Sequence, residues 1–499
     1  MALAACIRAH KLIDFNTHNT IEKQNHFLQK TILADKSLTK KEKSVAINLI
    51  KKYYDCCKVL NNIGTKRICE NCYDECLAMS YCEHCIRNYL KTNFSNWTSG
   101  NNDIDNLIQQ CQMETPTPNG IVEWIPHNNL QDIKYLTKGG FSEIYTAYWI
   151  DGQYDEWVSK EKRIKRRGKQ KVVLKKLKNI ESANRTWFEE GKFHLSINNK
   201  SENIVLTKDP SDGNYMLVIH RLDMDLKSYL QQSYNKLTWK EKIYIIKAII
   251  DAIYIIHEEN AIHRDLHSGN VLFSHSSQLV LVSDFGFCGP SNKQPNSIYG
   301  NLPYIAPEVV SKMEYSFASD IYSIGMLMWE ISSGQPPFIC KHNYDLAIKI
   351  INGMTKIIQG TPLEYKELME RCWDADPTKR PDITTLRKEI RKIHSYYLNN
   401  EEQQIISNDL QSNTRFNITS SSINSFFENI SSRVYSFKDL PEPRNATKEE
   451  QEALYYSIQF NFDLQDGLIT DDEKELAFNY KKVKFNNKGD DENLNTKTR

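Results

Sequence analysis

The feature that most restricts the fold of this chain is a series of short polar motifs in its second half. The segment His263-Arg-Asp-Leu-His-Ser-Gly-Asn270 directly follows a run patterned as a helix. Asp284-Phe-Gly286 begins 19 residues after Asp265, and Ala306-Pro-Glu308 follows it. Upstream, Val172-Val-Leu-Lys175 is patterned as a strand that ends in a lysine. Each piece alone could occur by chance, but together they indicate one site assembled from several segments.

Composition and charge exclude some classes of protein. The chain has 64 basic and 63 acidic residues in 499, so nothing global attracts nucleic acid or anionic membranes. The N-terminus lacks the apolar run of a secretory signal, and the most apolar stretch, 243–256, is too short and too charged to span a bilayer. We therefore expect a cytoplasmic protein, with the nucleus as the alternative, whose 12 cysteines are reduced.

Patterning divides the chain into four regions. Residues 1–60 are polar with helical periodicity. Residues 61–128 begin with five cysteines close together, within 61–90, and continue with a linker helix. Residues 129–394 alternate strand and helix patterns before becoming mostly helical. Residues 395–499 shift to Asn, Ser, Glu and Lys, which predicts a largely disordered tail.

Three capping-box patterns predict where helices begin, because a threonine and a glutamate three residues later satisfy each other's backbone N–H groups. These are Thr39-x-x-Glu42, Thr238-x-x-Glu241 and Thr447-x-x-Glu450. The second precedes a stripe of isoleucines at helical spacing, which predicts a buried face: Ile246, Ile249, Ile250, Ile253 and Ile256. A short helix is also expected at 104–108.

The ordered motifs resemble the protein-kinase signature set, over residues 129–394. The resemblance implies an α+β, bilobal kinase fold with a small β-rich N-lobe and a larger helical C-lobe. Here that fold would carry a small N-terminal Cys-rich module and the tail. The last part of the motif region looks closest to the tyrosine-kinase-like group, whose members mostly modify serine or threonine. The implied activity is transfer of the γ-phosphate of ATP to protein hydroxyls with Mg²⁺.

The resemblance also implies roles for individual residues. Asp265 would accept the proton of the incoming hydroxyl, and Asn270 and Asp284 would hold Mg²⁺. Lys175 would contact the α- and β-phosphates. Glu190 would hold that lysine, because Phe193 and Ile197 continue its inward face, with Glu189 as the fallback.

Further residues correspond to the nucleotide pocket and to the scaffold of the family. The loop over the phosphates would involve Thr137, Lys138, Gly139, Gly140, Ser142 and Ile144. Ile219 falls at the gatekeeper position, with the hinge at His220 to Leu222. Asp320 would anchor the backbone of the catalytic loop, and Arg380 would pair with Glu308.

The sequence departs from the family pattern in the phosphate loop and the catalytic loop. Of the three family glycines, expected at Thr137, Gly139 and Ser142, only the middle one remains, so we expect weaker ATP affinity. His267 replaces a lysine that neutralises the transferring phosphate. One hypothesis is a reduced rate that improves on mild acidification, since a free histidine has a pKa of about 6.5. The alternative is a plain hydrogen-bonding substitute with little pH effect.

The segment that follows the Asp-Phe-Gly motif bears on specificity and regulation. Asn301 stands where serine/threonine kinases usually carry threonine, yet the loop typical of tyrosine kinases is absent. Phe287 favours serine over threonine by analogy. Arg264, beside Asp265, suggests control by phosphorylation of this segment. The candidate acceptors are Ser291, Ser297 and Tyr299.

Two functions from different classes fit these departures. One is an active serine/threonine kinase in intracellular signalling. The other is a pseudokinase scaffold that binds partners without turnover. Retention of Lys175, Asp265, Asn270 and Asp284 favours the active enzyme, because the chemistry requires each of them. We expect ATP and protein substrates as partners, and adaptor contacts through the Cys-rich module and the tail.

The cysteine pattern Cys69-x₂-Cys72-x₉-Cys82-x₂-Cys85 has the spacing of a small zinc ribbon. Four thiolates can close a tetrahedral structural site without an open position, which predicts structural Zn²⁺. Cys76 is surplus, and His84 is the next-best ligand. Cysteine pairs followed by Trp97-Thr-Ser-Gly100 and then a kinase resemble the layout of an expanded family of fungal kinases.

A basic stretch at 160–178 contains eleven lysines and arginines. It could serve as a nuclear signal or nucleic-acid patch, or it could be a solvated hairpin between the second and third strands of the kinase sheet. Asp151, Asp155 and Glu156 partly offset its charge, so we favour the hairpin. The near-neutral Cys-rich segment gives no support for nucleic-acid binding.

Overall fold

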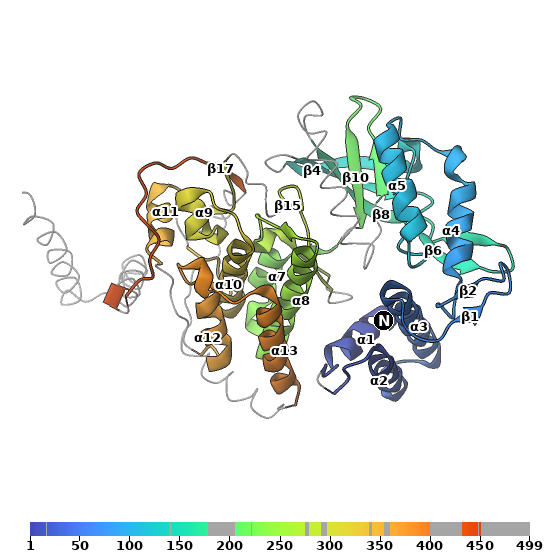
Figure 1. Cartoon of the computed structure of the whole chain (residues 1–499), viewed down its shortest axis with the longest axis horizontal. Helices are drawn as coiled ribbons and strands as arrows, with labels where there is room; N and C mark the ends of the chain where they lie inside the picture. The colour runs from blue at the N-terminus through green and yellow to red at the C-terminus, as the bar shows by residue number, and fades with distance from the viewer. Residues whose placement is uncertain are drawn as a thin grey trace, which may run out of the picture.

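The computed structural model describes most of the chain up to residue 399 and a short part beyond it. The described residues are 1–15, 17–138, 142–177, 205–220, 222–274, 279–290, 297–338, 342–353, 360–399, 432–447 and 449–450. Figure 1 shows a β-sheet with helices beside it, a bundle of helices joined to it, and a group of N-terminal helices. This arrangement provides the β-rich and helical parts that the kinase fold requires.

The β-rich part is built on one six-stranded sheet in the order β3-β9-β10-β8-β5-β4. Every neighbouring pair is antiparallel except β3 with β9. Alternation along β8 directs Val172 and Leu174 into the core of this sheet. The strands are β3 (Glu123–Trp124), β4 (Leu130–Lys138), β5 (Ser142–Trp149), β8 (Gln170–Leu177), β9 (Val205–Lys208) and β10 (Tyr215–His220).

The sheet extends beyond the predicted start of the kinase domain at residue 129. Strand β3 joins β9 as a parallel edge strand. Helix α5 (Asn102–Glu114), which contains the predicted 104–108 helix, packs Ile104 and Ile108 on Leu206 and Leu217. The preceding region therefore completes the hydrophobic core of the sheet instead of acting as a linker.

The basic stretch forms the hairpin that the sequence favoured. Strands β6 (Tyr154–Val158) and β7 (Arg163–Arg166) pair with each other between β5 and β8 in the chain. Two side chains of this hairpin, Trp157 and Ile164, are buried against the Cys-rich module. The hairpin is therefore solvated on one side only.

The Cys-rich module is small and has little regular structure. It consists of β1 (Arg67–Ile68), β2 (Glu75–Cys76) and α4 (Glu83–Thr92). Strands β1 and β2, of two residues each, pair antiparallel, and Cys82 caps the N-terminus of α4. We call residues 67–92 the Cys module.

Three N-terminal helices form a core of their own. They are α1 (Ala2–Lys11), α2 (Ile21–Ala34) and α3 (Lys40–Asn61). The predicted capping box at Thr39 is confirmed, since both of its hydrogen bonds are present. This group also reaches the helical part of the molecule: the Lys11 ammonium lies 4.2 Å from the Tyr244 ring centroid, and Ser395 donates to Asp14 at 3.2 Å.

The helical part surrounds α8, the helix predicted from the isoleucine stripe. Its capping box at Thr238 is present, and all five predicted isoleucines are buried. The helices of this part are α7 (Leu226–Ser233), α8 (Trp239–Glu258), α9 (Pro307–Lys312), α10 (Phe317–Ser333), α11 (Tyr344–Ile351), α12 (Leu363–Cys372) and α13 (Ile383–Asn399). Among the described residues, no helix is long and apolar enough to cross a membrane.

Short strands position the motifs on this helical part. A three-stranded sheet contains β11 (Met224–Asp225), β13 (Val271–Phe273) and β14 (Val280–Val282). Strand β12 (Ala261–Ile262) pairs with β15 (Gly289–Pro290). The loop between β12 and β13 carries Asp265 and Asn270, and Asp284 follows β14.

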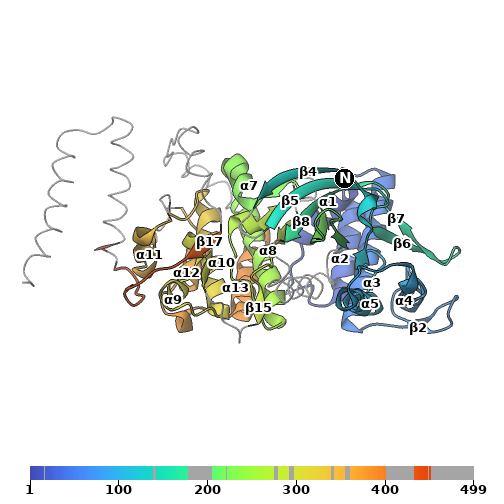
Figure 2. The ribbon, with the colours of Figure 1, turned by 90° about the horizontal axis from the view of Figure 1, so that it is seen from above.

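Part of the predicted disordered tail lies against the helices. Residues 432–446 run along the helical part, and β17 (Arg433–Tyr435) pairs with β16 (Ile298–Gly300). Seen from above, β17 and the N-terminal helices lie toward opposite ends of the molecule (Figure 2). We call residues 432–446 the docked segment. At Thr447 the capping-box hydrogen bonds to Glu450 are present, and the helix expected after it lies beyond the described residues.

Candidate active site

The loop that carries the predicted base is held by a buried carboxylate. Asp320, on α10, accepts hydrogen bonds from the backbone N–H of His263 at 2.8 Å and of Arg264 at 3.0 Å. It also lies 2.9 Å from Nε2 of His257. Arg264 has a φ of +67°, a conformation that costs energy for a residue with a side chain. These bonds hold the loop in that conformation.

Asp265 is nearly buried and is oriented by its neighbours. The Nδ2 of Asn270 donates to the main-chain oxygen of Asp265 at 2.8 Å and to its Oδ2 at 3.3 Å. Burial, with a smaller contribution from the Asp284 charge, raises the pKa of Asp265 well above its ordinary value. A carboxylate with a raised pKa accepts a proton more readily, which suits a general base.

An ion pair joins Lys175 of the β-rich part to Asp284 of the helical part. The Nζ of Lys175, on β8, donates to Oδ1 of Asp284 at 2.7 Å. Burial alone would raise the pKa of Asp284, but the Lys175 ammonium outweighs it and lowers the pKa to about 2. Asp284 is therefore ionised at neutral pH, and its side chain remains 37% exposed. Together with the amide oxygen of Asn270, it offers the hard oxygen donors that Mg²⁺ prefers.

The predicted nucleotide pocket is only partly within the described residues. Ile144 on β5 lies directly opposite Lys175 in the antiparallel pairing, and Ile219 on β10 lies opposite Val173. Thr137 and Lys138 end β4, Ser142 begins β5, His220 ends β10 and Leu222 follows it. Gly139, Gly140, Glu189 and Glu190 lie outside the described residues.

His267 is buried beside Asp265. Its Nδ1 accepts from the N–H of Gly269 at 3.1 Å, and its Nε2 lies 3.6 Å from Oδ1 of Asp265. Burial lowers the pKa of His267 to about 3. The imidazole is therefore neutral in this arrangement at mildly acidic pH, which favours the hydrogen-bonding alternative over activation by acid.

The two predicted scaffold residues form a buried ion pair. Arg380 Nη1 and Nη2 donate to the two carboxylate oxygens of Glu308, each at 2.7 Å. The same guanidinium donates to the carbonyls of Ala318 and Asp374. We call the stretch from the Asp-Phe-Gly motif to the Ala-Pro-Glu motif, 284–308, the activation segment. A bidentate pair of this kind fixes the position of α9, where the activation segment ends.

The candidate acceptors on the activation segment differ in their surroundings. Ser291 lies outside the described residues, and Ser297 is partly exposed. The ring of Tyr299 is buried, with its centroid 3.4 Å from that of Phe287, and its N–H donates to the Tyr315 hydroxyl. In this arrangement, Tyr299 is poorly placed to meet another enzyme.

One residue at the site was missed by the sequence analysis. The hydroxyl of Ser432 donates to Oδ1 of Asp265 at 2.8 Å and lies 3.0 Å from Nε2 of His267. Ser432 is 167 residues from Asp265 in a region whose composition predicted disorder. No local pattern could have indicated this contact.

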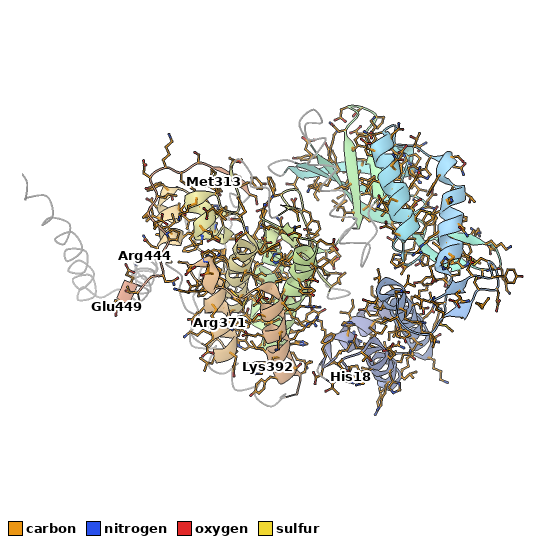
Figure 3. All side chains as sticks on the ribbon, viewed as in Figure 1. His18, Met313, Arg371, Lys392, Arg444 and Glu449 are labelled. Atoms are coloured by element: carbon orange, nitrogen blue, oxygen red, sulfur yellow. The ribbon has the colours of Figure 1, made fainter. Side chains whose placement is uncertain are left out.

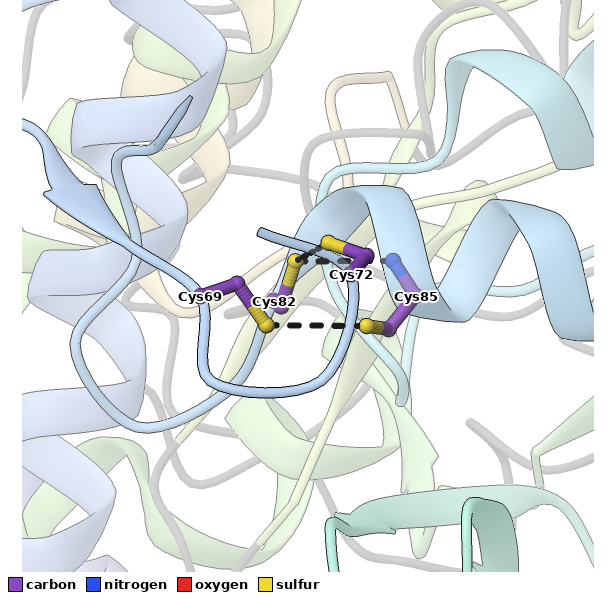
Figure 4. A group of neighbouring side chains, drawn as sticks. All are labelled: Cys69, Cys72, Cys82 and Cys85. Atoms are coloured by element: carbon purple, nitrogen blue, oxygen red, sulfur yellow. Dashed lines mark hydrogen bonds between the residues drawn. The ribbon is translucent and has the colours of Figure 1, made fainter. Parts of the chain in front are cut away.

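The four predicted zinc ligands come together in the Cys module (Figure 4). The Sγ atoms of Cys69, Cys72, Cys82 and Cys85 all lie within 4.8 Å of one another. The Cys69–Cys85 and Cys72–Cys82 separations are 3.7 and 3.6 Å. Zn–S bonds of about 2.3 Å in a tetrahedron place the sulfurs ~3.8 Å apart, so this donor set fits a zinc ion.

The surplus donors around this cluster are less suited to the same ion. Cys76, Cys82 and Glu83 also lie within 4.8 Å of one another. The Glu83 carboxylate, however, accepts from the N–H of Leu77 at 2.7 Å, so it is occupied by the backbone. His84 belongs to neither group of donors among the described residues.

Comparison with known proteins identifies the family. The model of the protein tyrosine and serine/threonine kinase family matches residues 130–390, and the chain belongs to this family. Three similar relatives are named as follows. The mouse dual serine/threonine and tyrosine protein kinase is 29% identical over 186 residues, 36% of this chain and 19% of the relative. The dual specificity protein kinase zakA of Dictyostelium discoideum is 28% identical over 173 residues (31% and 22%). The serine/threonine-protein kinase max-2 of Caenorhabditis elegans is 30% identical over 149 residues (28% and 23%).

The alignments with these three relatives cover between 28% and 36% of this chain. The matches with the curated relatives cover between 10% and 23% of each relative's length. The relatives include both serine/threonine and dual-specificity enzymes.

Proposed function

We propose that this chain is an ATP-dependent protein kinase that phosphorylates serine or threonine in protein substrates during intracellular signalling. The observation that carries the proposal is the convergence of Lys175, Asp265, Asn270 and Asp284 in a member of the kinase family. The scaffold alternative receives no support from the family or from the relatives, and all four of these side chains are present in the chain.

Each of the four side chains has a defined task in the proposed reaction. Asp265 orients the acceptor hydroxyl and takes its proton. Asn270 holds the Asp265 backbone and carboxylate in place through the two hydrogen bonds from its Nδ2. Lys175 would provide a positive charge at the phosphates, and its ion pair with Asp284 links the β-rich part to the helical part. Charge on the phosphate oxygens is neutralised by Mg²⁺ when that ion is bound to Asn270 and Asp284.

Preference for serine or threonine over tyrosine is the finer part of the proposal. It rests on the absence of the catalytic loop typical of tyrosine kinases and on the resemblance to the tyrosine-kinase-like group, whose members mostly modify serine or threonine. His267 would act as a neutral hydrogen-bonding group where related enzymes use a lysine, so we expect a modest catalytic rate.

We also propose that the Cys module holds one structural Zn²⁺ through Cys69, Cys72, Cys82 and Cys85. The sulfur separations support this proposal. The N–H groups of Asn71 and Cys85 point at Sγ of Cys69 and Cys82, which stabilises thiolates. The fungal-type layout, the domain limits at 60 and 394, adaptor contacts and a cytoplasmic location remain proposals, as does the limit at 128, before which β3 already joins the sheet.

Phosphate incorporation is the direct test of the kinase proposal. Purified full chain would be incubated with Mg²⁺, labelled ATP and a generic basic protein substrate, followed by phosphoamino-acid analysis. We expect label on serine or threonine, and a decrease of about 10²-fold or more for Asp265→Asn, because general-base catalysis contributes that much.

Asp212→Asn is the matched control, since it makes the same chemical change on the β9–β10 turn, where the carboxylate pairs with Lys176 at 2.5 Å. It should retain activity. A folded wild-type chain that binds ATP but incorporates no label would overturn the proposal in favour of the scaffold. Label on tyrosine alone would overturn the proposed specificity.

A further inference from the structure

The docked segment places a hydroxyl at the catalytic base. Ser432 Oγ donates to Asp265 Oδ1 at 2.8 Å, within the 2.6–3.2 Å that general-base catalysis requires. The same oxygen lies 3.0 Å from Nε2 of His267, so two groups of the catalytic loop orient it. The contact therefore has the geometry of an acceptor and its base.

The backbone beside Ser432 is paired with a strand that lies close to the catalytic base. Strand β17 pairs in antiparallel register with β16 of the activation segment, with Arg433 opposite Gly300 and Tyr435 opposite Ile298. Gly300 has a φ of +133°, and a Cβ there would approach Asp265 Oδ1 to 3.1 Å. A side chain at position 300 would occupy space beside the Asp265 carboxylate, and glycine leaves that space open for the incoming hydroxyl.

Side chains of the docked segment anchor this strand. Tyr435 is 7% exposed within the core of the helical part, and its ring stacks on Phe437. Arg433 Nη2 donates to the carbonyl of His342 at 2.9 Å. The anchors on either side of Val434 fix the register, so Ser432 cannot slide away from Asp265 without breaking them.

The segment continues along the helices and is held at its far end. The N–H of Arg444 donates to the carbonyl of Ile351 at 2.9 Å, and Asn445 bonds to Ala375 and Asp374. Gly353 faces this stretch, where a Cβ would lie 2.7 Å from the Arg444 carbonyl. Figure 3 labels Arg444 at the end of the molecule away from His18 in the N-terminal helices. The fit along this path indicates a built contact between the segment and its own kinase domain.

We propose that Ser432 is an autophosphorylation site that the kinase modifies in cis. This inference rests on the proposed kinase function. Ser432 follows Asn399 by 33 residues, and a chain of that length reaches roughly 110 Å, enough to deliver the serine to its own site. The tether also raises the effective concentration of the acceptor above that of a free substrate.

The reaction is a phosphoryl transfer from bound ATP. Ser432 Oγ forms a bond to the γ-phosphorus as the bond between that phosphorus and the β–γ bridging oxygen breaks, and ADP leaves with the electron pair. The hydroxyl proton passes to Asp265 and then to water. The phosphoserine carries about −1.5 to −2 charges beside Asp265, so repulsion then expels the segment from the site. Before the reaction, the segment competes with other protein substrates.

The test uses the full chain, Mg²⁺ and ATP, with an added basic peptide as an internal standard of activity. Trypsin separates Ser432, in the peptide 416–433, from Ser436, in the peptide 434–438, and fragment-ion mass spectra then distinguish Ser432 from the other hydroxyl residues of its peptide, such as Ser431. We expect phosphate on Ser432, lost in Ser432→Ala and retained in Ser436→Ala. Ser436 is the matched control because it is an exposed serine of the same segment. The first-order rate constant should not change with protein concentration.

A second measurement does not depend on turnover. Amide hydrogen exchange of the nucleotide-free chain should show protection at 298–300 and 433–435, which is lost after phosphorylation. Two results would overturn the cis proposal while leaving the kinase function intact. One is phosphate on the added basic peptide with none on Ser432. The other is a first-order rate constant of Ser432 phosphorylation that rises with protein concentration. Absence of phosphate from both Ser432 and the added basic peptide would overturn the proposed kinase function itself.

Discussion

The Cys module and the docked segment both lie against the kinase domain, but different forces hold them there. The Cys module shares a hydrophobic cluster with Trp157 and Ile164 of the β6–β7 hairpin. The docked segment buries Tyr435 in the helical core and packs the partly buried Phe437 and Leu440 against it. It is otherwise held by hydrogen bonds and an exposed ion pair.

This difference indicates which attachment can be reversed. Apolar burial contributes about 25 cal/mol per Å², so an interface of buried side chains opens rarely. Hydrogen bonds at a wet surface contribute about 1 kcal/mol each, because water replaces them. We infer that the Cys module is a permanent part of the fold and that the docked segment can leave. The following predictions test that contrast, beginning with the largest effect.

Loss of one zinc ligand should unfold the Cys module. In Cys82→Ser the tetrahedral thiolate site is incomplete, and structural zinc contributes about 10–16 kcal/mol in small zinc peptides. We expect one bound zinc in the wild type by elemental mass spectrometry, and its loss in the variant together with fast amide exchange over 67–92. Cys57→Ser, on α3 outside the cluster, is the control and should keep its zinc. Equal metal content in all three proteins would contradict the zinc proposal.

The apolar contact between the hairpin and the Cys module should make the next largest contribution to the free energy of unfolding. Trp157 is 7% exposed, and its ring lies edge-on to Tyr89 at 6.1 Å. Truncation of a buried aromatic residue costs about 3–5 kcal/mol, so Trp157→Ala should lower the free energy of unfolding by that amount in urea denaturation. Glu156→Gln, on the same strand with a half-exposed side chain, should change it little. A small loss in Trp157→Ala would mean that the module is held mainly in some other way.

A pH titration tests the helical core itself. In the part of the chain that the structure describes, the docked segment lies against this core and the Cys module does not. Burial raises the pKa of Glu330 on α10 to about 7, although hydrogen bonds from Tyr304 and Ser268 oppose the rise. The folded state therefore holds a proton that the unfolded state releases above about pH 4.5. Stability from this group is full below pH 4.5 and is lost as pH rises through 7, by up to ~3 kcal/mol. Chemical denaturation at several pH values should show a shallower fall for Glu330→Gln, and parallel curves would refute the assignment.

Release of the docked segment should cost little global stability. In Tyr435→Ala the single buried anchor is gone, so we expect amide exchange at 298–300 and 433–435 to rise by at least about tenfold, equivalent to ~1.4 kcal/mol. The Cys module should keep its protection. A concerted loss of protection in both regions would show that they are coupled, and the proposed contrast would fail.

The smallest effect is expected at the exposed ion pair of the docked segment. Glu442 pairs with Lys312 at 2.8 Å, but its side chain is 78% exposed. Ion pairs of this kind contribute little, because solvent screens them. Glu442→Gln should leave amide exchange of the segment unchanged within error, and a clear acceleration would show that charge holds the segment in place.

The sequence by itself determined the features that depend on short-range chemistry. The capping boxes at Thr39 and Thr238, the buried face of α8 and the β6–β7 hairpin all follow from local patterns, and the kinase motifs identified the family. Spacing also predicted four cysteines that do come together, because a metal site imposes its geometry on nearby residues.

Only the tertiary structure decided where distant segments meet. Strand β3 completes the sheet from outside the expected domain, because its edge pairing with β9 depends on a partner some 80 residues away. Burial lowers the pKa of His267, and no sequence pattern shows that burial. The contact of Ser432 with Asp265 joins residues 167 apart and involves few apolar side chains, so composition alone classed that segment as disordered.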